Sequence, residues 1–593
     1  MTDQRPLSLK RERAQSANRS RISNLIADVL VDHEILHLTQ TFSYGIPDAL
    51  RAVVHVGSTV RVPFRNSEKP GVVVGIRSDN ESVKTISKAL NSWAFSRSTL
   101  ELAKEVAQRY GSHQLEILNS VPSRSNQPWP IDIANRNSES DRRFIAIRQD
   151  SFEELITHLK MRKGSSLIIF PTEREASHFY DKVVRNSNRK CLNYFGPNSA
   201  KVNKALEDSM RSGEEVVVVS CRGGVFLQIA NLVEMVIVDE QAEDFWELRR
   251  PYWNVRDVSL IRSRLEKLDL IFLSSAPSLE LTRLIEAGYI KNERKLPKLS
   301  RRNIFDFEDA GYVRAIRHGL QEGAVLVSVA EKSYSGSFLC ANCRNSPRCS
   351  CGALLRSKSK ENLECKVCGF SSSGWKCNEC GSSKMLFLRK GAERIHEELG
   401  KAFPKTPILI STAEKPIHEV SSGSIVIATP GMQPPSVRFA ALVLLDGWVF
   451  LNRPGLRAEE SLRRHWFRLL SQTKGGARVY VSLPRSNSIS QDLVQGNALK
   501  GSLRQLADRN PTKLPPAYRV ILLSGNNVAD IVLKLKSEFP GIEPSRSSES
   551  SAIAIRVKVE EAQSLVDALS ALNRYRSVSR RDLLRIQIDP YDV

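Results

Sequence analysis

CANCRNSPRCSCGALLRSKSKENLECKVCGFSSSGWKCNEC, from Cys340 to Cys380, contains eight of the ten cysteines of this chain. They form four close pairs: Cys340 and Cys343, Cys349 and Cys351, Cys365 and Cys368, Cys377 and Cys380. Four pairs are the ligand count for two tetrahedral zinc ions, because a turn between two nearby cysteines aims both thiolates at one metal. A disulfide cluster is the alternative, but short-spaced pairs without a secretion signal favour metal. The stretch therefore predicts two Zn²⁺ per chain.

Length and charge indicate a large protein with a polyanionic partner. At 593 residues the chain is too long for one core, so about three to five domains are expected. The net charge is +22, from 87 Lys+Arg against 65 Asp+Glu. This excess favours nucleic acid, and a basic surface without a dedicated partner is the alternative. The sequence has neither an apolar run of ~18 residues nor a signal-peptide pattern, so a cytoplasmic, nucleoid-associated location is expected.

The patterning predicts a multidomain α/β protein. Short β-rich runs near the N-terminus predict a small β-rich domain. Short apolar runs such as Leu167–Phe170 alternate with helical patterns, which predicts two α/β lobes with parallel sheets buried on both faces. We expect a disordered basic tail over 1–24, the β-rich domain over 25–122, a linker over 123–141, one lobe over 142–295, a second over 296–510 with the cysteine insertion at 338–388, and a small C-terminal α/β domain over 511–593.

Two consecutive α/β lobes are typical of a nucleotide-driven motor, but the nucleotide-binding motifs are missing. The phosphate loop Gly-x-x-x-x-Gly-Lys-Ser/Thr is absent, and Lys163-Gly-Ser-Ser166 reads as a turn. Asp239-Glu240 ends a strand, as a Mg²⁺-binding acid pair or a simple acidic turn would. Where an arginine finger is expected, residues 471–478 have one arginine beyond a Gly-Gly turn. The sequence therefore predicts a vestigial nucleotide site at Asp239 and Glu240, no catalytic residues, and little capacity for ATP.

Two basic stretches are candidate DNA contacts. Arg61 and Lys84 share the β-rich domain with Phe42 and Tyr44, and aromatic rings stack on bases while basic side chains bind phosphates. The C-terminal patch consists of Arg574, Arg576, Arg580 and Arg581. A solvated face is the alternative in each case, but the absence of interleaved acids in the second patch favours phosphate contact.

Several segments resemble, in chain order, those of the PriA family of bacterial replication-restart helicases, especially its shortened actinobacterial members. Thr41-Phe-Ser-Tyr44 is similar to the family's Phe-Asp-Tyr segment, and Gly57–Phe64 to its Gly-x-x-Val-Arg-Val-Pro-Phe. Leu232–Glu240 resembles its strand ending in Asp-Glu, and the cysteine pairs match its two-zinc insertion. The resemblance covers nearly the whole chain and implies two RecA-like helicase lobes, which are degenerate here because the phosphate loop and the Gly-Arg-Ala-Gly-Arg motif have no counterpart.

The resemblance also implies site residues. Phe42, Tyr44 and Lys84 would hold the 3′ end of a nascent strand, although Ser43 stands where the family has Asp and Arg65 where it has Gly. One zinc would be bound by Cys340, Cys343, Cys377 and Cys380, and the second by Cys349, Cys351, Cys365 and Cys368. The family's winged-helix domain has no room between Val121 and the first lobe.

We therefore expect a replication restart protein that binds stalled or abandoned forks and promotes primosome assembly and reloading of the replicative helicase, without helicase activity of its own. The expected partners are forked and single-stranded DNA, primosome proteins and the replicative helicase, with single-stranded DNA-binding protein as a further candidate and no membrane. Two alternatives stay open. An active ATP-dependent 3′–5′ helicase would show strand displacement that Asp239→Asn abolishes, and a zinc-ribbon nucleic-acid-binding regulator would show no fork preference.

Overall fold

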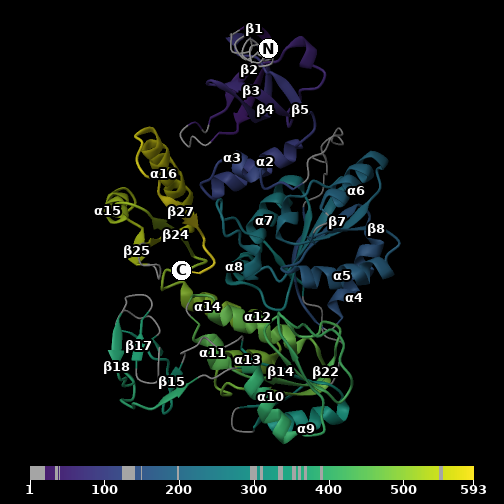
Figure 1. Cartoon of the computed structure of the whole chain (residues 1–593), viewed down its shortest axis with the longest axis vertical. Coiled ribbons are helices and arrows are strands. Elements are labelled where there is room, and N and C mark those ends of the chain that lie inside the picture. Colours follow the sequence, from purple (N-terminus) through teal and green to yellow (C-terminus); the bar gives the residue numbers. More distant parts are fainter. Residues whose placement is uncertain are drawn as a thin grey trace, which may run out of the picture.

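The computed structural model describes residues 21–33, 38, 40–122, 140–148, 150–196, 199–293, 303–307, 311–330, 338–349, 355–357, 362–365, 370–387, 391–453, 455–546 and 552–592. The predicted fold class is confirmed: a β-rich N-terminal domain, two RecA-like parallel α/β lobes, a cysteine-rich insertion and a small C-terminal α/β domain (Figure 1). In those residues we find no helix with both the length and the hydropathy for crossing a bilayer.

The N-terminal sheet is antiparallel, with strand order β2-β1-β4-β3-β5. Its elements are β1 (Arg21–Val31), β2 (Phe42–Gly45), η1 (Asp48–Leu50), β3 (Thr59–Phe64), β4 (Ser67–Val83) and β5 (Lys88–Asn91), followed by α2 (Arg97–Arg109) and α3 (Gln114–Leu118). A bridge between Gly45 and Thr85 joins the edge strand β2 to the segment before β5, so the sheet curls toward a barrel. The predicted tail is wrong for residues 21–24, because β1 pairs with β4 from Arg21 onward. Residues 1–20 and 123–139, parts of the predicted tail and linker, lie outside the described residues.

Lobe 1 contains a seven-stranded sheet of order β12-β6-β11-β10-β7-β9-β8, and all its strand pairs are parallel. Its elements are β6 (Arg142–Ala146), α4 (Ser151–Met161), β7 (Ser165–Ile169), α5 (Glu173–Asn186), β8 (Lys190–Tyr194), α6 (Ser199–Ser212), β9 (Val216–Ser220), η4 (Arg222–Phe226), β10 (Leu232–Val238), η5 (Glu243–Phe245), α7 (Val255–Glu266), β11 (Asp269–Ser274), α8 (Leu279–Glu286) and β12 (Lys291–Glu293). In β7, Leu167 and Ile169 pack into one apolar cluster and Ile168 into another, so both faces of the sheet are buried.

Lobe 2 repeats this design with a six-stranded parallel sheet of order β13-β23-β22-β14-β21-β20. Its elements are β13 (Ile304–Asp306), α9 (Tyr312–Glu322), β14 (Val325–Ser328), α10 (Gly391–Ala402), β20 (Ile408–Ser411), β21 (Ile425–Ala428), β22 (Phe439–Leu444), α11 (Gly447–Leu451), α12 (Ala458–Leu470), β23 (Thr473–Val481), α13 (Ser488–Gln495) and α14 (Ala498–Arg509). The alternation along β14 again divides the apolar side chains between two clusters, with Leu326 on one face and Val327 on the other.

The cysteine-rich insertion leaves lobe 2 after β14 and returns before α10. It contains β15 (Phe338–Cys340), β16 (Arg356–Ser357), β17 (Asn362–Glu364), β18 (Ser371–Ser373) and β19 (Met385–Phe387). Antiparallel pairing of β15 with β19 brings the beginning and the end of the insertion together. Its apolar cluster is small, with Phe338, Leu355 and Leu363 as the buried side chains besides two cysteines. So small a core favours a metal as the main source of stability.

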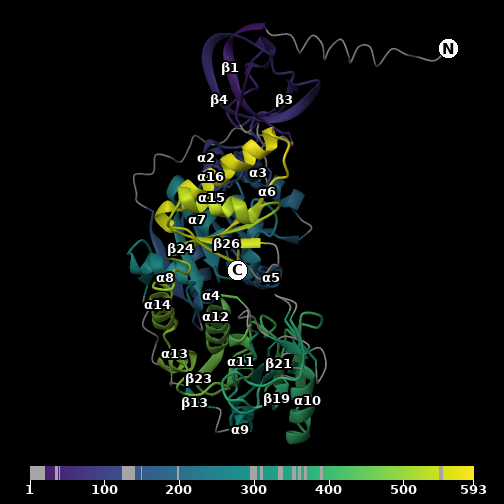
Figure 2. The same cartoon turned by 90° about the vertical axis from the view of Figure 1, so that its left-hand side faces the viewer.

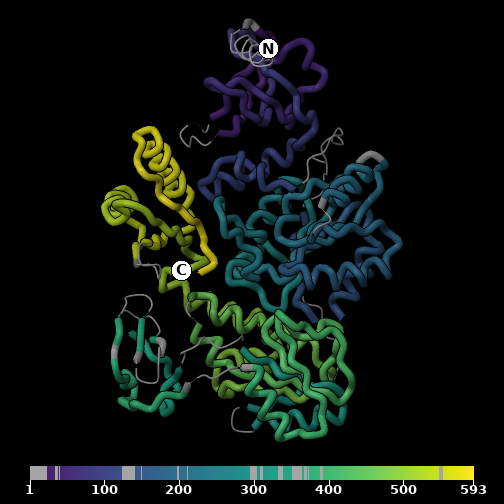
Figure 3. The backbone as a smooth tube through the Cα atoms, in the orientation of Figure 1, coloured from purple at the N-terminus to yellow at the C-terminus, as the bar shows by residue number. Residues whose placement is uncertain are grey.

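The C-terminal domain has an antiparallel sheet of order β25-β26-β24-β27 with two helices. Its elements are β24 (Tyr518–Ser524), α15 (Val528–Glu538), β25 (Glu543–Arg546), β26 (Ala552–Lys558), α16 (Val559–Val578) and β27 (Arg585–Ile588). One continuous apolar cluster joins it to α2, α3 and lobe 1, whereas the N-terminal sheet has its own cluster. The domain lies against lobe 1, between the N-terminal sheet and the insertion (Figures 2 and 3).

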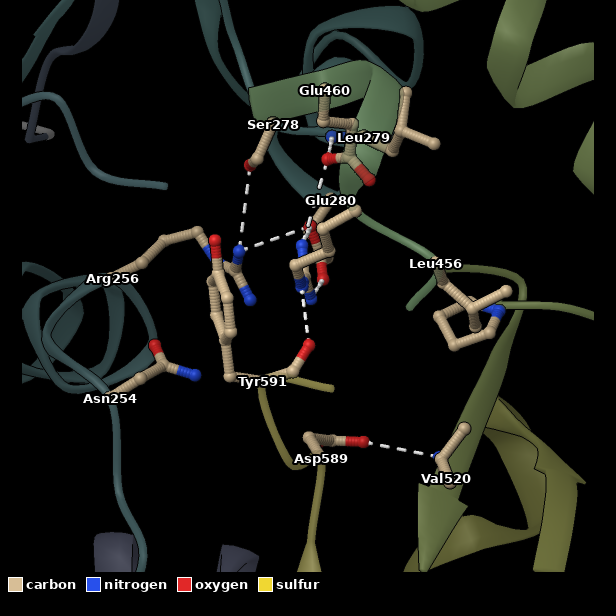
Figure 4. A network of polar contacts seen from close by, with 12 residues as sticks. Asn254, Arg256, Ser278, Leu279, Glu280, Leu456, Glu460, Val520, Asp589 and Tyr591 are labelled. Atoms are coloured by element: carbon tan, nitrogen blue, oxygen red, sulfur yellow. Dashed lines mark hydrogen bonds and ion pairs between the residues drawn. The ribbon is translucent and has the colours of Figure 1, made fainter. Parts of the chain in front are cut away.

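A polar network joins three parts of the chain at Glu280, at the start of α8 (Figure 4). Arg457, just before α12 of lobe 2, places Nη2 2.5 Å from Glu280 Oε1 and donates from Nε to the Tyr591 carbonyl at 3.0 Å. Arg256 of lobe 1 places Nη1 3.1 Å from the other oxygen of the same carboxylate. Glu280 and both arginines are largely buried, so each charge depends on the others for compensation.

Candidate metal centre and nucleic-acid interface

Four cysteine sulfurs converge at the base of the insertion. The Sγ atoms of Cys340, Cys343, Cys377 and Cys380 all lie within 4.8 Å of one another. Cys340 Sγ is 3.5 Å from Cys380 Sγ, and Cys343 Sγ is 3.5 Å from Cys377 Sγ. A disulfide would place two sulfurs at about 2.05 Å, so these distances describe separate thiols around one centre. The spacing suits a four-coordinate metal ion.

The two cysteine pairs of this centre have the same backbone geometry. The N–H of Cys340 donates to the carbonyl of Asn345, and that of Cys377 donates to the carbonyl of Ser382, both at 2.9 Å. The residue after each pair has a positive φ, 60° at Arg344 and 70° at Gly381. Glycine adopts this conformation without strain, and Arg344 is held in it by a hydrogen bond to the Cys340 carbonyl at 3.0 Å.

The charge state of these thiols supports a bound cation. The backbone N–H of Ser382 is the main cause that lowers the pKa of Cys380, to about 6. The pKa of Cys343 is nevertheless raised to about 12: the Asn345 N–H lowers it, but burial and the neighbouring thiol of Cys377 outweigh that effect. Four thiolates so close together repel one another, and a divalent cation is what allows all four to ionise.

The second predicted zinc site is only partly described. Cys349 and Cys365 are buried in the apolar cluster of the insertion. Cys351 and Cys368 lie outside the described residues, so the site over Cys349, Cys351, Cys365 and Cys368 stays a prediction.

The acid pair Asp239-Glu240 lies at the carboxyl end of β10, where the loop after β11 covers it. The backbone N–H of Ser275 and the hydroxyl of Ser274 donate to Asp239 Oδ1, at 3.2 and 3.1 Å. The backbone N–H of Ser278 donates to Glu240 Oε1 at 2.8 Å. Burial raises the pKa of Glu240 to about 7. Both acids therefore hold a loop of their own lobe, an arrangement that needs no metal or nucleotide.

Three strand-to-helix connections of lobe 1 are shorter than a phosphate cradle. That motif occupies eight residues between a strand and a helix. Only residues 147–150 separate β6 from α4, 170–172 separate β7 from α5, and 275–278 separate β11 from α8. The longer connection from Asp239 to Asn254 contains no glycine. Lys163-Gly-Ser-Ser166 enters β7 rather than a helix, in line with its reading as a turn.

The region expected to carry an arginine finger is a strand. β23 runs from Thr473 to Val481, but its pairing with β22 is interrupted between Thr473 and Arg478, where Gly476 has a positive φ of 82°. Arg478 is used inside lobe 2, with Nη1 3.1 Å from Asp306 Oδ2. One of the lobe 2 arginines that face lobe 1 is Arg468 on α12, which the sequence did not single out. The sequence feature that could have indicated it is the helical period of residues 458–470, which places Arg468 outside the buried face of the helix.

The predicted 3′-end pocket is partly corrected by the N-terminal sheet. Tyr44 is 4% exposed, and its hydroxyl donates to the Pro63 carbonyl at 3.1 Å, so its ring belongs to the core and cannot stack on a base. Phe42 is half-buried, with its ring centroid 5.3 Å from that of Phe64. His33, which the sequence did not indicate, stacks on Phe64 at 4.9 Å. These three rings form the aromatic cluster of this domain. Arg61 is exposed and Lys84 is half-buried.

The C-terminal arginines also divide into two kinds. Arg574, Arg580 and Arg581 are exposed around the end of α16. Arg576 is 8% exposed, and its Nε donates to the Asp582 carbonyl at 2.6 Å, so it fixes the connection between α16 and β27 instead of facing solvent. The prediction of Arg576 as a DNA contact is therefore wrong, because its guanidinium is buried and is used by the connection between α16 and β27.

Comparisons with known proteins show which proteins this chain is similar to. The model of the PriA 3′ DNA-binding domain matches residues 28–122. The "Probable replication restart protein PriA" of Mycobacterium tuberculosis (strain ATCC 25618 / H37Rv) is 25% identical, covering 94% of this chain and 99% of the relative. The chain is therefore similar to PriA over nearly its whole length. The PriA of Rickettsia conorii is 24% identical, covering 90% of this chain and 91% of the relative.

Solved structures resemble parts of this chain at low identity. RecG bound to a three-way DNA junction gives a TM-score of 0.35 at 13% identity, covering 75% of this chain and 50% of that one. S. cerevisiae Dbp5 bound to RNA and ADP BeF3 gives 0.33 at 11% identity, covering 63% and 85%.

Proposed function

We propose that this PriA-type protein binds stalled or abandoned replication forks and promotes primosome assembly and reloading of the replicative helicase, without unwinding DNA itself. The observation that carries the proposal is the match of residues 28–122 to a 3′ DNA-binding domain within a chain similar to PriA over nearly its full length. A net charge of +22 supports a nucleic acid as the partner.

The absence of helicase activity is proposed from the geometry of lobe 1. Three strand-to-helix connections are shorter than a phosphate cradle, and Asp239 and Glu240 are used by the loop after β11. Phosphoryl transfer depends almost entirely on such groups positioning and neutralising the phosphates. The main alternative, an ATP-driven helicase, would need phosphates held by a different set of residues.

Zinc is the proposed metal of the insertion. Sulfurs at about 2.3 Å from a tetrahedral zinc ion lie about 3.8 Å apart, close to the 3.5 Å between paired sulfurs here. Zinc bound by Cys340, Cys343, Cys377 and Cys380 would stabilise the insertion, and a second ion at the partly described site would do the same for its far end. The folded insertion is the proposed surface for primosome partners.

DNA contact is proposed at two surfaces. One contains the exposed Arg61 and half-buried Lys84 of the N-terminal domain. The other contains Arg574, Arg580 and Arg581 at the end of α16. In Figure 2 that end of α16 points toward the N-terminal sheet, an arrangement that suits two arms of one branched DNA.

Competition binding of three DNAs tests this function. We expect a fork with a 3′ end at its branch to compete better than duplex or single-stranded DNA, and to keep its advantage as salt is raised, because phosphate contacts alone weaken with salt. Replacing Arg580 and Arg581 with Gln should weaken all three DNAs and reduce the salt slope by roughly 1–2. The matched control replaces Lys534 and Lys536, exposed on α15 of the same domain, and should change little. Equal affinity for the three DNAs would support the zinc-ribbon regulator instead.

A further inference from the structure

The two lobes meet at a cleft that is already filled by their own side chains. Its lobe 1 wall is formed by the end of β6, α4 and α5, and its lobe 2 wall by residues 431–438 and the end of α12. The remaining cavity is about 140 Å³. The short β6–α4 turn, the connection that would have to widen for phosphates, lies in this wall through Ile147 and Arg148. The side chains that fill the cleft therefore determine whether the two lobes can move apart.

Arg468 is the centre of these contacts. Its Nη2 lies 3.5 Å from Glu175 Oε1 of α5, and its guanidinium lies 5.0 Å from the ring centroid of Phe152 on α4. The side chain of Arg468 is 15% exposed and that of Glu175 is 26% exposed, so water screens the pair only partly. Burial raises the pKa of Glu175, and Arg468 acts against that rise. Arg468 thus contacts both the Glu175 carboxylate and the Phe152 ring of the opposite lobe, where water would otherwise lie.

Four further contacts cross the same cleft. Arg174 of α5 donates from Nη1 to the Gly431 carbonyl at 3.1 Å and from Nη2 to the Ile417 carbonyl at 3.4 Å. Arg438 places Nη2 3.7 Å from Asp150 Oδ1, at the β6–α4 turn. The Ser436 hydroxyl and His178 Nε2 are 3.1 Å apart. Side chains of both lobes contribute, so the cleft is closed from both walls.

The other side of the lobe interface is bridged as well. The backbone N–H of Leu279 donates to Glu460 Oε2 at 3.1 Å, and the Ser502 hydroxyl donates to the Pro277 carbonyl at 3.2 Å. Together with Arg457 and Glu280 (Figure 4), these contacts join the lobes on the side opposite Arg468. Contacts on two sides restrain both hinge bending and sliding.

We propose that Arg468, Glu175, Arg174 and Arg438 form a lobe latch, which keeps the two lobes closed by protein contacts at the place where a motor would need a nucleotide. The inference goes beyond DNA recognition, because it concerns how the lobes are held whichever DNA is bound. The closed lobes act as a rigid spacer between the terminal DNA-binding domains and the insertion. A ligand can shift the equilibrium between open and closed lobes only if it binds one of these two states more tightly than the other. Because protein side chains already hold the lobes closed, a nucleotide would gain little by binding the closed state.

Single-molecule energy transfer across the cleft tests the latch in the full-length protein. Dyes are attached through a non-canonical amino acid at positions 201 and 405, where exposed lysines lie on lobe 1 and lobe 2. We expect one narrow, high-transfer population that is unchanged by ATP and Mg²⁺ and by forked DNA. A broad or exchanging population, or a shift on adding ATP, overturns the latch even if the protein binds forks well.

The double variant Arg468→Ala/Arg438→Ala adds the second test. We expect low-transfer molecules to increase by about fivefold or more, because a closed state held by a few contacts responds strongly to their loss. The control Arg485→Ala removes an arginine that lies 6.0 Å from the ring of Phe307 within lobe 2, and should leave the distance unchanged. Circular dichroism and metal content check that the variants are folded. A folded double variant that stays closed would contradict the proposal.

Discussion

At the scale of single residues, Glu240 is a buried acid with only one of its two carboxylate oxygens hydrogen-bonded in the described part of the chain. It is fully buried, and among the described residues its Oε2 has no hydrogen-bond partner while Oε1 accepts from the Ser278 N–H. A buried carboxylate with one unsatisfied oxygen is costly when ionised. In an ATPase a metal would compensate that charge, whereas here burial raises the pKa of Glu240 from 4.5 to about 7.

Glu240→Gln should therefore stabilise the protein at alkaline pH. A carboxyl whose folded pKa is raised contributes most when protonated, and stability falls as pH rises from about 4.5 to about 7. Glutamine keeps the acceptor for Ser278 without a proton to lose. We expect a gain of roughly 1–3 kcal/mol at pH 8 that shrinks toward pH 5, measured by chemical denaturation. The control is Glu397→Gln, exposed on α10. An equal effect of Glu240→Gln at both pH values would contradict the raised pKa.

The two corrected DNA contacts are also explained at this scale, and one of them was predictable. Arg574 and Arg576 are two positions apart on α16, about 200° around the helix, so the sequence already indicated that they point to different sides of it. Tyr44 was not predictable. It follows Phe42 by two residues and shares its face of β2, and which ring remains accessible depends on how the sheet curls through the Gly45–Thr85 bridge. Their spacing predicted that Phe42 and Tyr44 share one face of β2. Only the tertiary structure shows that Tyr44 is buried and Phe42 is half-buried.

At the scale of elements, the insertion was the most predictable part of the fold. Short cysteine pairs followed by turn residues encode the local loop geometry, and positive φ at Gly381 agrees with the glycine there. Which pairs share a metal does not follow from spacing. The antiparallel pairing of β15 with β19 decides it by bringing Cys340 and Cys343 to Cys377 and Cys380. The family resemblance anticipated this grouping.

Cys380→Ser tests the metal centre at the scale of the insertion. Serine is a poor ligand in place of a thiolate, so we expect the metal content to fall by about one zinc ion per chain. Proteolysis within the insertion should increase, because its apolar cluster is too small to stay folded alone. Elemental analysis measures the first effect. The matched control is Cys191→Ser on β8 of lobe 1. The metal content of this variant should equal that of the unchanged protein. Unchanged zinc in Cys380→Ser would exclude this residue as a ligand.

At the scale of the whole molecule, the lobes join parts of the chain that are distant in sequence. Runs of buried apolar residues predicted both parallel sheets, because a strand buried on both faces needs no polar alternation. Contacts such as Arg468 with Glu175 and Arg457 with Glu280 could not be predicted in this way. They depend on the angle between two lobes, which no local pattern encodes.

The same contacts give the molecule its proposed mode of action. With the lobes held closed, the N-terminal domain at one end of the molecule and the C-terminal domain and the insertion beside the lobes keep fixed positions (Figure 1). Fork binding then depends on the spacing of these parts instead of on a cycle of ATP binding and hydrolysis.

The most direct test is a titration of a forked DNA with the protein, in the presence and absence of ATP and Mg²⁺. We predict the same fork affinity in both conditions, within about twofold, since closed lobes without a phosphate cradle give ATP no state to favour. A change in fork affinity of about tenfold with ATP, or separation of the strands during the titration, would contradict a fork-binding protein whose lobes work without nucleotide.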